Sequence, residues 1–142
     1  MERRPRGQVR HINPDGLHKN PAYTNVITVR GQVNTIYIGG QDAVDGSGSI
    51  VGKGDLKRQT EQVLANIQIA LKAAGAELKN VIKWNLYIVQ GQSLQPGFEA
   101  FQKVWGYRPD PPLITMAFVS GLANPEFLVE MDAIAVLPQD SE

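Results

Sequence analysis

Apolar residues recur with a helical spacing in two segments of the chain. Between residues 56 and 74 they follow the i, i+3, i+4, i+7 pattern of a helix with one buried face. Asp55 is a suitable N-cap for this helix, and Gly75 is a suitable stop. A shorter helix is predicted over 94–105. The buried face of the longer helix is formed by Leu56, Thr60, Val63, Leu64, Ile67, Ala70, Leu71 and Ala74, and that of the shorter one by Phe98, Phe101, Val104 and Trp105.

Other segments alternate or run apolar in the manner of strands. β-Branched residues predict a strand over 23–30, and Gly31 and Gln32 supply a turn into a second strand over 33–38. Residues 81–89 alternate with Trp84 on one face and Tyr87 on the other. Two further apolar runs fill 111–137 around a turn at 123–125. We therefore expect five strands and two helices.

The order of these elements is β-β-α-β-α-β-β, which is typical of an α+β domain with both helices on one face of a mixed sheet. The glycine-rich segment 42–54 is expected to be a loop, and residues 1–22 show no sustained periodicity, so we expect an irregular N-terminal arm over about 1–20. No segment has the composition of a linker. The 142 residues therefore predict a single domain.

Composition narrows the classes of function. Lys plus Arg number 14 and Asp plus Glu also number 14, so the net charge is zero, and a broad basic surface for nucleic acid is not expected. The chain contains no cysteine, which excludes disulfides and a thiolate nucleophile and fits a reducing, cytoplasmic location. No apolar run is long enough for a transmembrane helix, and the basic first ten residues are not followed by a signal-peptide core.

Most candidate sites in the sequence are weak. His11 and His18 are the only histidines and have no carboxylates at ligand spacing, so no metal site is predicted. Ser120 lacks the context of a hydrolase nucleophile. The glycines of 46–54 do not keep the spacing of a phosphate-binding loop. No cofactor is expected.

Glu130 is the exception among these candidates. It lies inside an apolar strand, where a carboxylate is costly unless it is paired, hydrogen-bonded or used. Alternation leaves a second interpretation open, because Glu130 and Asp132 would both lie on one face of the strand, and that face could simply be exposed to solvent.

The chain as a whole resembles the Rid family, also called YjgF/YER057c/UK114. The residues that carry the resemblance extend over nearly the entire length. They are Pro21, Tyr23, Thr24, Gly31, Gly40, Gln41, Ile50, Val51, Gly52, Gln59, Thr60, Val63, Leu64, Asn66, Ile67, Ala74, Gly75, Val81, Lys83, Tyr87, Pro111, Pro112 and Val129 to Ala135.

This resemblance implies a fold like that of chorismate mutase, assembled as a homotrimer with small-molecule sites in the clefts between subunits. Members of its best-known group hydrolyse enamine and imine metabolites such as 2-aminoacrylate to 2-keto acids and ammonia. In that group a glutamate on the last strand acts on water, a tyrosine near the N-terminus contacts the ligand, and an arginine in the pattern Pro-Ala-Arg-Ser binds the substrate carboxylate.

Carried over by position, the glutamate is Glu130 and the tyrosine is Tyr23. Gly39 and Gly40 stand where the family has a serine-glycine pair. The arginine is absent, because Leu113 occupies its position and a leucine cannot form a bidentate clamp on a carboxylate.

One further difference lies near that position. Phe98 replaces an asparagine, so this side of the cleft is expected to be more apolar. The resemblance predicts ligand contacts for Leu113, Thr115 and Arg108. Arg108 is either a solvated loop arginine, as its Pro-rich segment favours, or a replacement cation that enters the cleft.

Three functions follow as alternatives. The first is a divergent imine or enamine hydrolase with an altered substrate. The second is a trimer that binds a small metabolite without turning it over, which Leu113 and Phe98 favour. The third is ribonuclease action, an activity also reported under this family's name, which the balanced charge favours least.

Overall fold

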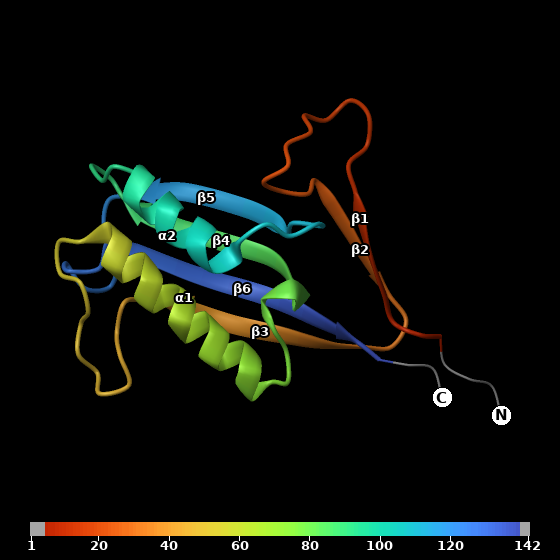
Figure 1. The fold of residues 1–142 in the computed structure, drawn as a ribbon, viewed down its shortest axis with the longest axis horizontal. Coiled ribbons are helices and arrows are strands. Elements are labelled where there is room, and N and C mark those ends of the chain that lie inside the picture. Colours follow the sequence, from red (N-terminus) through yellow and green to blue (C-terminus); the bar gives the residue numbers. More distant parts are fainter. Residues whose placement is uncertain (1–4, 140–142) are drawn as a thin grey trace.

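The computed structural model describes residues 5–139 as one α+β unit. A sheet of four strands has the order β3-β6-β4-β5, with β4 and β5 parallel and the other neighbours antiparallel. Figure 1 shows α1 and α2 side by side across this sheet. The expected mixed sheet with two helices on one face is confirmed. The strands of this sheet are β3 (Val33–Gln41), β4 (Val81–Val89), β5 (Leu113–Val119) and β6 (Val129–Pro138), and the helices are α1 (Leu56–Ala73) and α2 (Gln95–Trp105).

The core lies between α1 and the sheet, where the two periodicities meet. The apolar stripe of α1 packs on β6 and β3, and α2 packs on α1. Alternate residues of β6 face the helices, and Trp84 of β4 is fully buried beside them. A short 3-10 helix, η1 (Leu78–Asn80), leads from α1 into β4. The central members of the core are Val63, Leu64, Ile67, Leu71, Trp84, Met131, Ala133 and Ala135.

The N-terminal region differs from the sequence expectation in two ways. The irregular arm is wrong in part, because β1 (Gln8–Ile12) is a strand that pairs antiparallel with β2 (Val26–Arg30) in a separate two-stranded sheet. The turn predicted at Gly31 and Gln32 is present, but the two strands that it joins lie in different sheets, since β3 pairs with β6. Residues 1–4 of the expected irregular arm lie outside the described residues.

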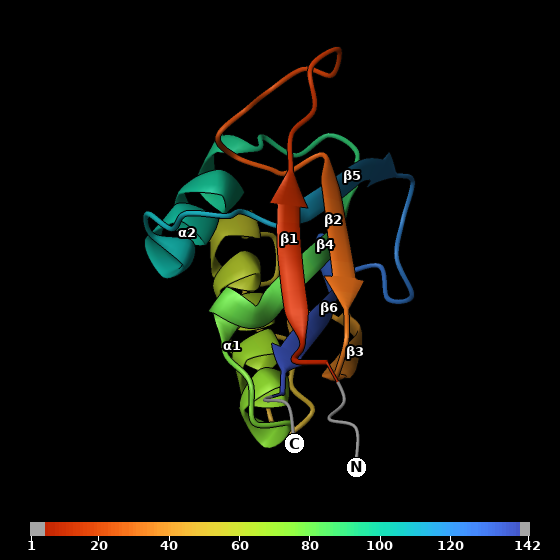
Figure 2. The same ribbon diagram turned by 90° about the vertical axis from the view of Figure 1, so that its right-hand side faces the viewer.

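Backbone pairing explains both differences. β1 supplies β2 with a complete antiparallel partner, and β6 is long enough to pair with β3 on one side and β4 on the other. Gln32 then ties the ribbon to the main sheet, because its carbonyl accepts a hydrogen bond from the Gln139 amide at 2.9 Å. In Figure 2 the β1–β2 ribbon lies in front of the main sheet, with the helices to its left.

The sheet face opposite the helices, called here the open face, has no helix of the described chain over it (Figure 2). Strand register places one set of alternate residues on this face. They are Tyr37 of β3, Lys83, Asn85 and Tyr87 of β4, Leu113, Thr115 and Ala117 of β5, and Glu130, Asp132 and Ile134 of β6. Within residues 5–139 no helix is long and apolar enough to cross a membrane.

Candidate functional site

Glu130 lies on the open face at the beginning of β6, opposite Tyr87 of β4. It is half-buried, while its neighbours Val129 and Met131 point into the core. Alternation therefore assigns the correct face to Glu130, but the face is not simply solvated. On its other side β3 has an irregularity between Ile38 and Gln41, which places Gly39 and Gly40 outside the regular register.

Gly40 makes room for the Glu130 carboxylate. A Cβ atom added at Gly40 would lie 2.8 Å from Glu130 Oε2 and 2.9 Å from Glu130 Cδ, which is closer than real Cβ contacts allow. Gly39 has no such neighbour, since an added Cβ would meet nothing within 4 Å. Of the two glycines that the sequence pointed to, only Gly40 is therefore required by the contact with Glu130.

Asp42 is the functional candidate that sequence reasoning missed. Its carboxyl group lies against that of Glu130: burial, a hydrogen bond with Glu130 and the negative charge of Glu130 together raise the pKa of Asp42 to about 7. Asp42 Oδ1 is buried and has no hydrogen-bond partner within residues 5–139. A carboxyl group with a pKa of about 7 is still protonated in part of the molecules at neutral pH. We call Gly40, Asp42, Tyr87 and Glu130 the carboxylate corner.

Two polar side chains of α1 hold the carboxylate corner in place. The Gln59 side chain is fully buried and bridges two loops: its Nε2 donates to the carbonyls of Gly52 and Glu126, and its Oε1 accepts from the Leu128 amide at 2.8 Å. Asn66 Nδ2 donates to the Asp42 carbonyl at 3.1 Å. These bonds fix the loop after β3 next to the start of β6.

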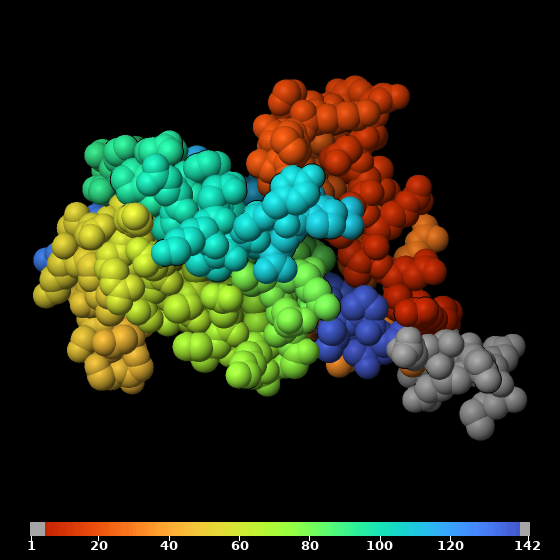
Figure 3. Space-filling model, in the orientation of Figure 1, coloured from red at the N-terminus to blue at the C-terminus, as the bar shows by residue number. Residues whose placement is uncertain are grey.

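The other predicted residues lie elsewhere. Tyr23 lies in the connection between β1 and β2, and its neighbour Thr24 donates its backbone N–H to the Pro112 carbonyl at 3.1 Å, just before Leu113. Figure 3 shows the N-terminal arm against the segment that follows α2. Leu113 is half-buried at the beginning of β5, and Thr115 is exposed one row further along.

Arg108 is not the solvated arginine that its segment favoured. It is half-buried, its Nε donates to the Trp105 carbonyl at 2.8 Å, and its guanidinium carbon lies 5.1 Å from the centre of the Trp105 ring. It lines a cavity of about 680 Å³ between α2 and the helix-covered side of β4 and β5. We call this the aromatic cavity. Tyr23 and Phe98 also line it.

Strand register separates the two groups of predicted residues within one chain. Leu113 pairs with Lys83, which pairs with Ile134, four positions along β6 from Glu130. This separation is roughly 13 Å along the strand and roughly 10 Å across two strand spacings. The structure therefore brings Gly40 to Glu130 but does not bring Leu113, Tyr23 or Arg108 to it in the same chain.

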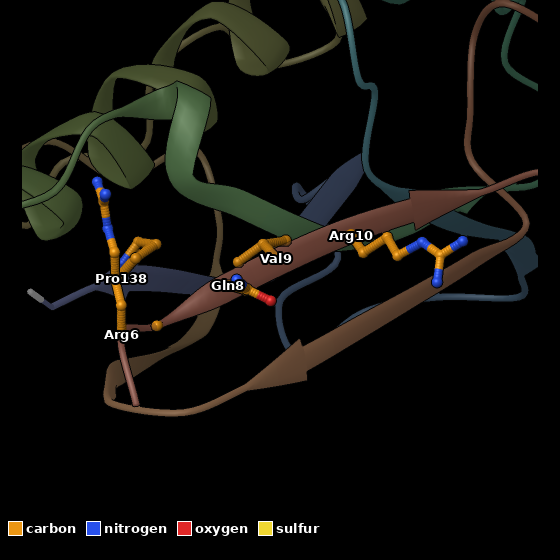
Figure 4. Close-up of a pocket in the computed structure, with 6 residues that line it drawn as sticks. Arg6, Gln8, Val9, Arg10 and Pro138 are labelled. Atoms are coloured by element: carbon orange, nitrogen blue, oxygen red, sulfur yellow. The ribbon is translucent and has the colours of Figure 1, made fainter. Parts of the chain in front are cut away.

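A second hollow, of about 510 Å³, is lined by Arg6, Gly7, Gln8, Val9, Arg10 and Pro138. In Figure 4 the Arg6 side chain points toward the helices and that of Arg10 runs along β1, so the two guanidinium groups do not converge on one anion. Among residues 5–139 no group of three or more histidine, aspartate or glutamate side chains is placed to hold a metal ion.

Comparison with known proteins agrees with this fold and order of motifs. The family model described as Endoribonuclease L-PSP matches residues 17–137. A RutC family protein of Pyrococcus abyssi is 33% identical over 102 residues, covering 72% of this chain and 78% of that protein, and one of Pyrococcus horikoshii is 35% identical over 102 residues, covering 72% and 79%.

Solved structures show the same architecture. The Rid-family protein YyfB of Yersinia pestis, described as of unknown function, superposes with a TM-score of 0.78 at 30% identity, over 91% of this chain and 98% of that one. The YjgF gene product of E. coli shares the fold at 22% identity and a TM-score of 0.65, over 72% and 80%. The chain belongs to the endoribonuclease L-PSP family, the Rid/YjgF family of proteins.

Proposed function

We propose that this protein is a hydrolase that deaminates an imine or enamine metabolite, with Glu130 positioning and deprotonating the attacking water. The observation that carries the proposal is the carboxylate corner, in which Glu130 lies on an accessible sheet face against Gly40 and beside Asp42, whose pKa is raised to about 7. A pair of carboxyl groups with one proton supplies a base and an acid at neutral pH.

The reaction needs both of these roles. Water adds its oxygen to the carbon of the C=N bond, and the ionised carboxylate takes the proton that the water loses. The nitrogen receives a proton from the protonated carboxyl, which gives a carbinolamine. The carbinolamine nitrogen then takes the proton that the first carboxylate accepted from water, the hydroxyl returns a proton to the second carboxylate, and the C–N bond breaks. The products are a carbonyl compound and ammonia, and both carboxyl groups are back in their starting states. An enamine enters the same sequence after its carbon is protonated to give the imine. Tyr87, opposite Glu130, is placed to orient the water.

We also propose that the reacting cleft forms between subunits of a homotrimer. Leu113 and Glu130 share the open face but lie two strands and four positions apart within one chain. Tyr23 lines the other side of the sheet. A cleft that contains all three therefore needs residues from two chains. The open face, with Tyr37 76% exposed on it, supplies the surface for such contacts.

Leu113 defines the substrate class. Without an arginine at this position the cleft has no bidentate clamp for a carboxylate, and a charge-assisted contact of about 1.5–3 kcal/mol is lost. We therefore propose a substrate that is more apolar or less acidic than 2-aminoacrylate. The cysteine-free sequence supports action in the reducing cytoplasm.

The test is hydrolysis of imines made in situ. A threonine dehydratase supplies 2-aminoacrylate from serine and 2-iminobutyrate from threonine, and an amino acid oxidase supplies the bulkier imine of leucine. We expect acceleration, greatest for the leucine-derived imine, that Glu130→Gln abolishes. We expect Leu113→Arg to shift the preference toward 2-aminoacrylate. No acceleration with any of these imines, by protein shown to be a folded trimer by light scattering, would refute the hydrolase.

A second function is favoured by the apolar substitution itself. If Leu113 and the exposed Phe98 mark a cleft that binds a ligand without catalysing its reaction, the protein is a non-catalytic trimer that holds a small metabolite. A thermal-shift screen distinguishes the two functions. A compound that raises the melting temperature of wild type and Glu130→Gln equally, without being consumed, supports binding alone. A screen without any stabilising compound argues against this alternative.

A further inference from the structure

The aromatic cavity has the size and composition of a ligand site. Its volume of about 680 Å³ falls within the roughly 300–1,000 Å³ of typical small-molecule pockets. It lies on the helix-covered side of the sheet, whereas Glu130 lies on the open face. Its apolar wall is contributed by α2, by β4 and β5, and by the arm at 21–23. The main apolar members are Tyr23, Leu86, Phe98, Phe101, Trp105 and Met116.

Large rings keep this space open. Trp84 of β4 meets Phe101 and Trp105 of α2 edge to face, with ring centres 6.1 and 6.2 Å apart, and Phe101 and Trp105 stack on each other at 5.9 Å. These three rings pack against one another between α2 and β4, beside the cavity. Beyond them the side chains of Phe98 and Met116 remain 54% and 46% exposed, so the cavity has an apolar mouth.

Arg108 is the only basic residue that lines this apolar cavity. Its Nε is used by the Trp105 carbonyl and its plane is held near the Trp105 ring, which fixes the side chain. Within residues 5–139 no carboxylate forms an ion pair with it, whereas Lys19 and Lys79 each have one. The two terminal nitrogens of the guanidinium are thus left for a ligand. A fixed fork of N–H donors matches the geometry of a carboxylate.

We propose that the aromatic cavity binds a small, largely apolar monocarboxylate, with its alkyl or aryl body among the rings and its carboxylate on the terminal nitrogens of Arg108. Charge complementarity selects this class, because a half-buried guanidinium without an acidic partner favours an anion, and the walls favour an apolar body. The site lies on the opposite face of the sheet from the carboxylate corner. It shares Tyr23 with the proposed inter-subunit cleft, but binding in it requires no hydrolysis.

The experiment uses three probes with the same eight-carbon chain: octanoate, octan-1-ol and octylamine. Binding to the full chain is followed by calorimetry and by tryptophan emission, since both tryptophans, Trp84 and Trp105, belong to the ring cluster. We expect octanoate to bind more tightly than octanol and octylamine to bind most weakly. Because no reaction is involved, failure of this test is distinct from failure of the hydrolysis assay.

Three variants distinguish the contribution of the Arg108 charge to binding from that of the cavity volume. We expect Arg108→Gln to weaken octanoate binding about 10- to 100-fold, the equivalent of losing one charge-assisted hydrogen-bonded contact, and to leave octanol binding unchanged. Lys103→Gln, which removes an exposed cation from α2, should leave the binding of all three probes unaffected. Met116→Trp places a bulky indole ring in the cavity and should weaken the binding of octanoate and of octanol alike.

Three results would overturn the proposal. Equal binding of octanoate and octylamine would mean adventitious partition onto an apolar surface. Unchanged octanoate affinity in Arg108→Gln, shown to be folded by circular dichroism, would remove the role of the guanidinium. Absence of binding by wild type would mean that the cavity is closed or covered, for example by a neighbouring subunit.

Discussion

The carboxylate corner and the aromatic cavity lie on opposite faces of the same sheet and are built by opposite physical means. In the corner, burial and the neighbouring Glu130 carboxylate raise the pKa of Asp42 to about 7. In the cavity, a cation is held by a carbonyl and a ring without an acidic partner among residues 5–139. The first arrangement suits the proposed proton transfer, and the second suits the proposed anion binding. If both proposals hold, this fold separates acid–base chemistry from anion binding.

The largest effect is expected from a change at Glu130. Removing its base function should slow imine hydrolysis by about 10²- to 10⁴-fold, the usual contribution of a general base. Glu130→Gln keeps the shape of the side chain, and the measurement is the initial rate of ketone formation.

Asp132 offers a matched control for this prediction. It lies on the same face of the same strand, two residues further on, and accepts a hydrogen bond from Asn85 at 2.7 Å. Asp132→Asn retains an acceptor oxygen and should keep nearly full activity. Equal losses in the two variants would show that the open face tolerates no change and would remove the special role of Glu130.

The ring cluster of the cavity should dominate stability. Trp84 is fully buried and packs against two rings, so Trp84→Ala should lower the free energy of unfolding by about 3–5 kcal/mol. Phe98→Ala, at the exposed mouth of the cavity, should cost less than about 1 kcal/mol. Urea denaturation measures both. Similar losses in the two variants would contradict a cavity supported from its buried end.

Gln59 connects the stability of the fold to the carboxylate corner. Gln59→Leu leaves the Glu126 carbonyl and the Leu128 amide without their partner, so we expect a loss of about 2–4 kcal/mol and a looser start of β6. Gln62→Leu, on the same helix, removes only a hydrogen bond with Asn66 and should cost under about 1 kcal/mol. Native-state hydrogen exchange at the Leu128 amide should increase only in Gln59→Leu.

Asp42 should leave a signature in the dependence of stability on pH. Because its pKa is raised on folding, the folded state retains a proton that the unfolded state releases, so its contribution to stability is fully present below about pH 4 and is lost as pH rises through about 7. Asp42→Asn removes this loss. We expect the melting temperature of the variant, relative to wild type, to increase between pH 5 and pH 8.

Asp45, in the same loop, provides a control of opposite sign. Hydrogen bonds from Ser47 and Ser49 lower the pKa of Asp45, so its contribution is present above its unfolded pKa and is lost as the solution becomes more acidic. Asp45→Asn should therefore change stability mainly above pH 4, with no trend between pH 5 and pH 8. The same trend in both variants would indicate a general loop effect and would contradict the pairing of Asp42 with Glu130.

Sequence patterns identified the helices and the faces of the strands because these properties are local. The spacing of apolar residues placed α1 within one residue of its observed end, and alternation placed Glu130 opposite the core. The same patterns did not identify β1. Its five residues include two charged or titratable side chains and lie in a segment rich in proline and glycine. The pairing of β2 with β1 and of β3 with β6 could not be predicted from periodicity, because strand pairing depends on segments distant in the chain.

The amino-acid patterns were enough to identify the family, the α+β class and the loss of the arginine at Leu113. The contact of Asp42 with Glu130 and that of Arg108 with Trp105 became visible only in the folded chain. Periodicity reports the environment of a residue along its own helix or strand. The pKa of a carboxyl group depends instead on burial and on neighbours distant in the chain, here 88 positions away for Asp42 and Glu130 (130 minus 42). Arg108 is only three positions from Trp105, and its contact depends on how the chain folds back after α2.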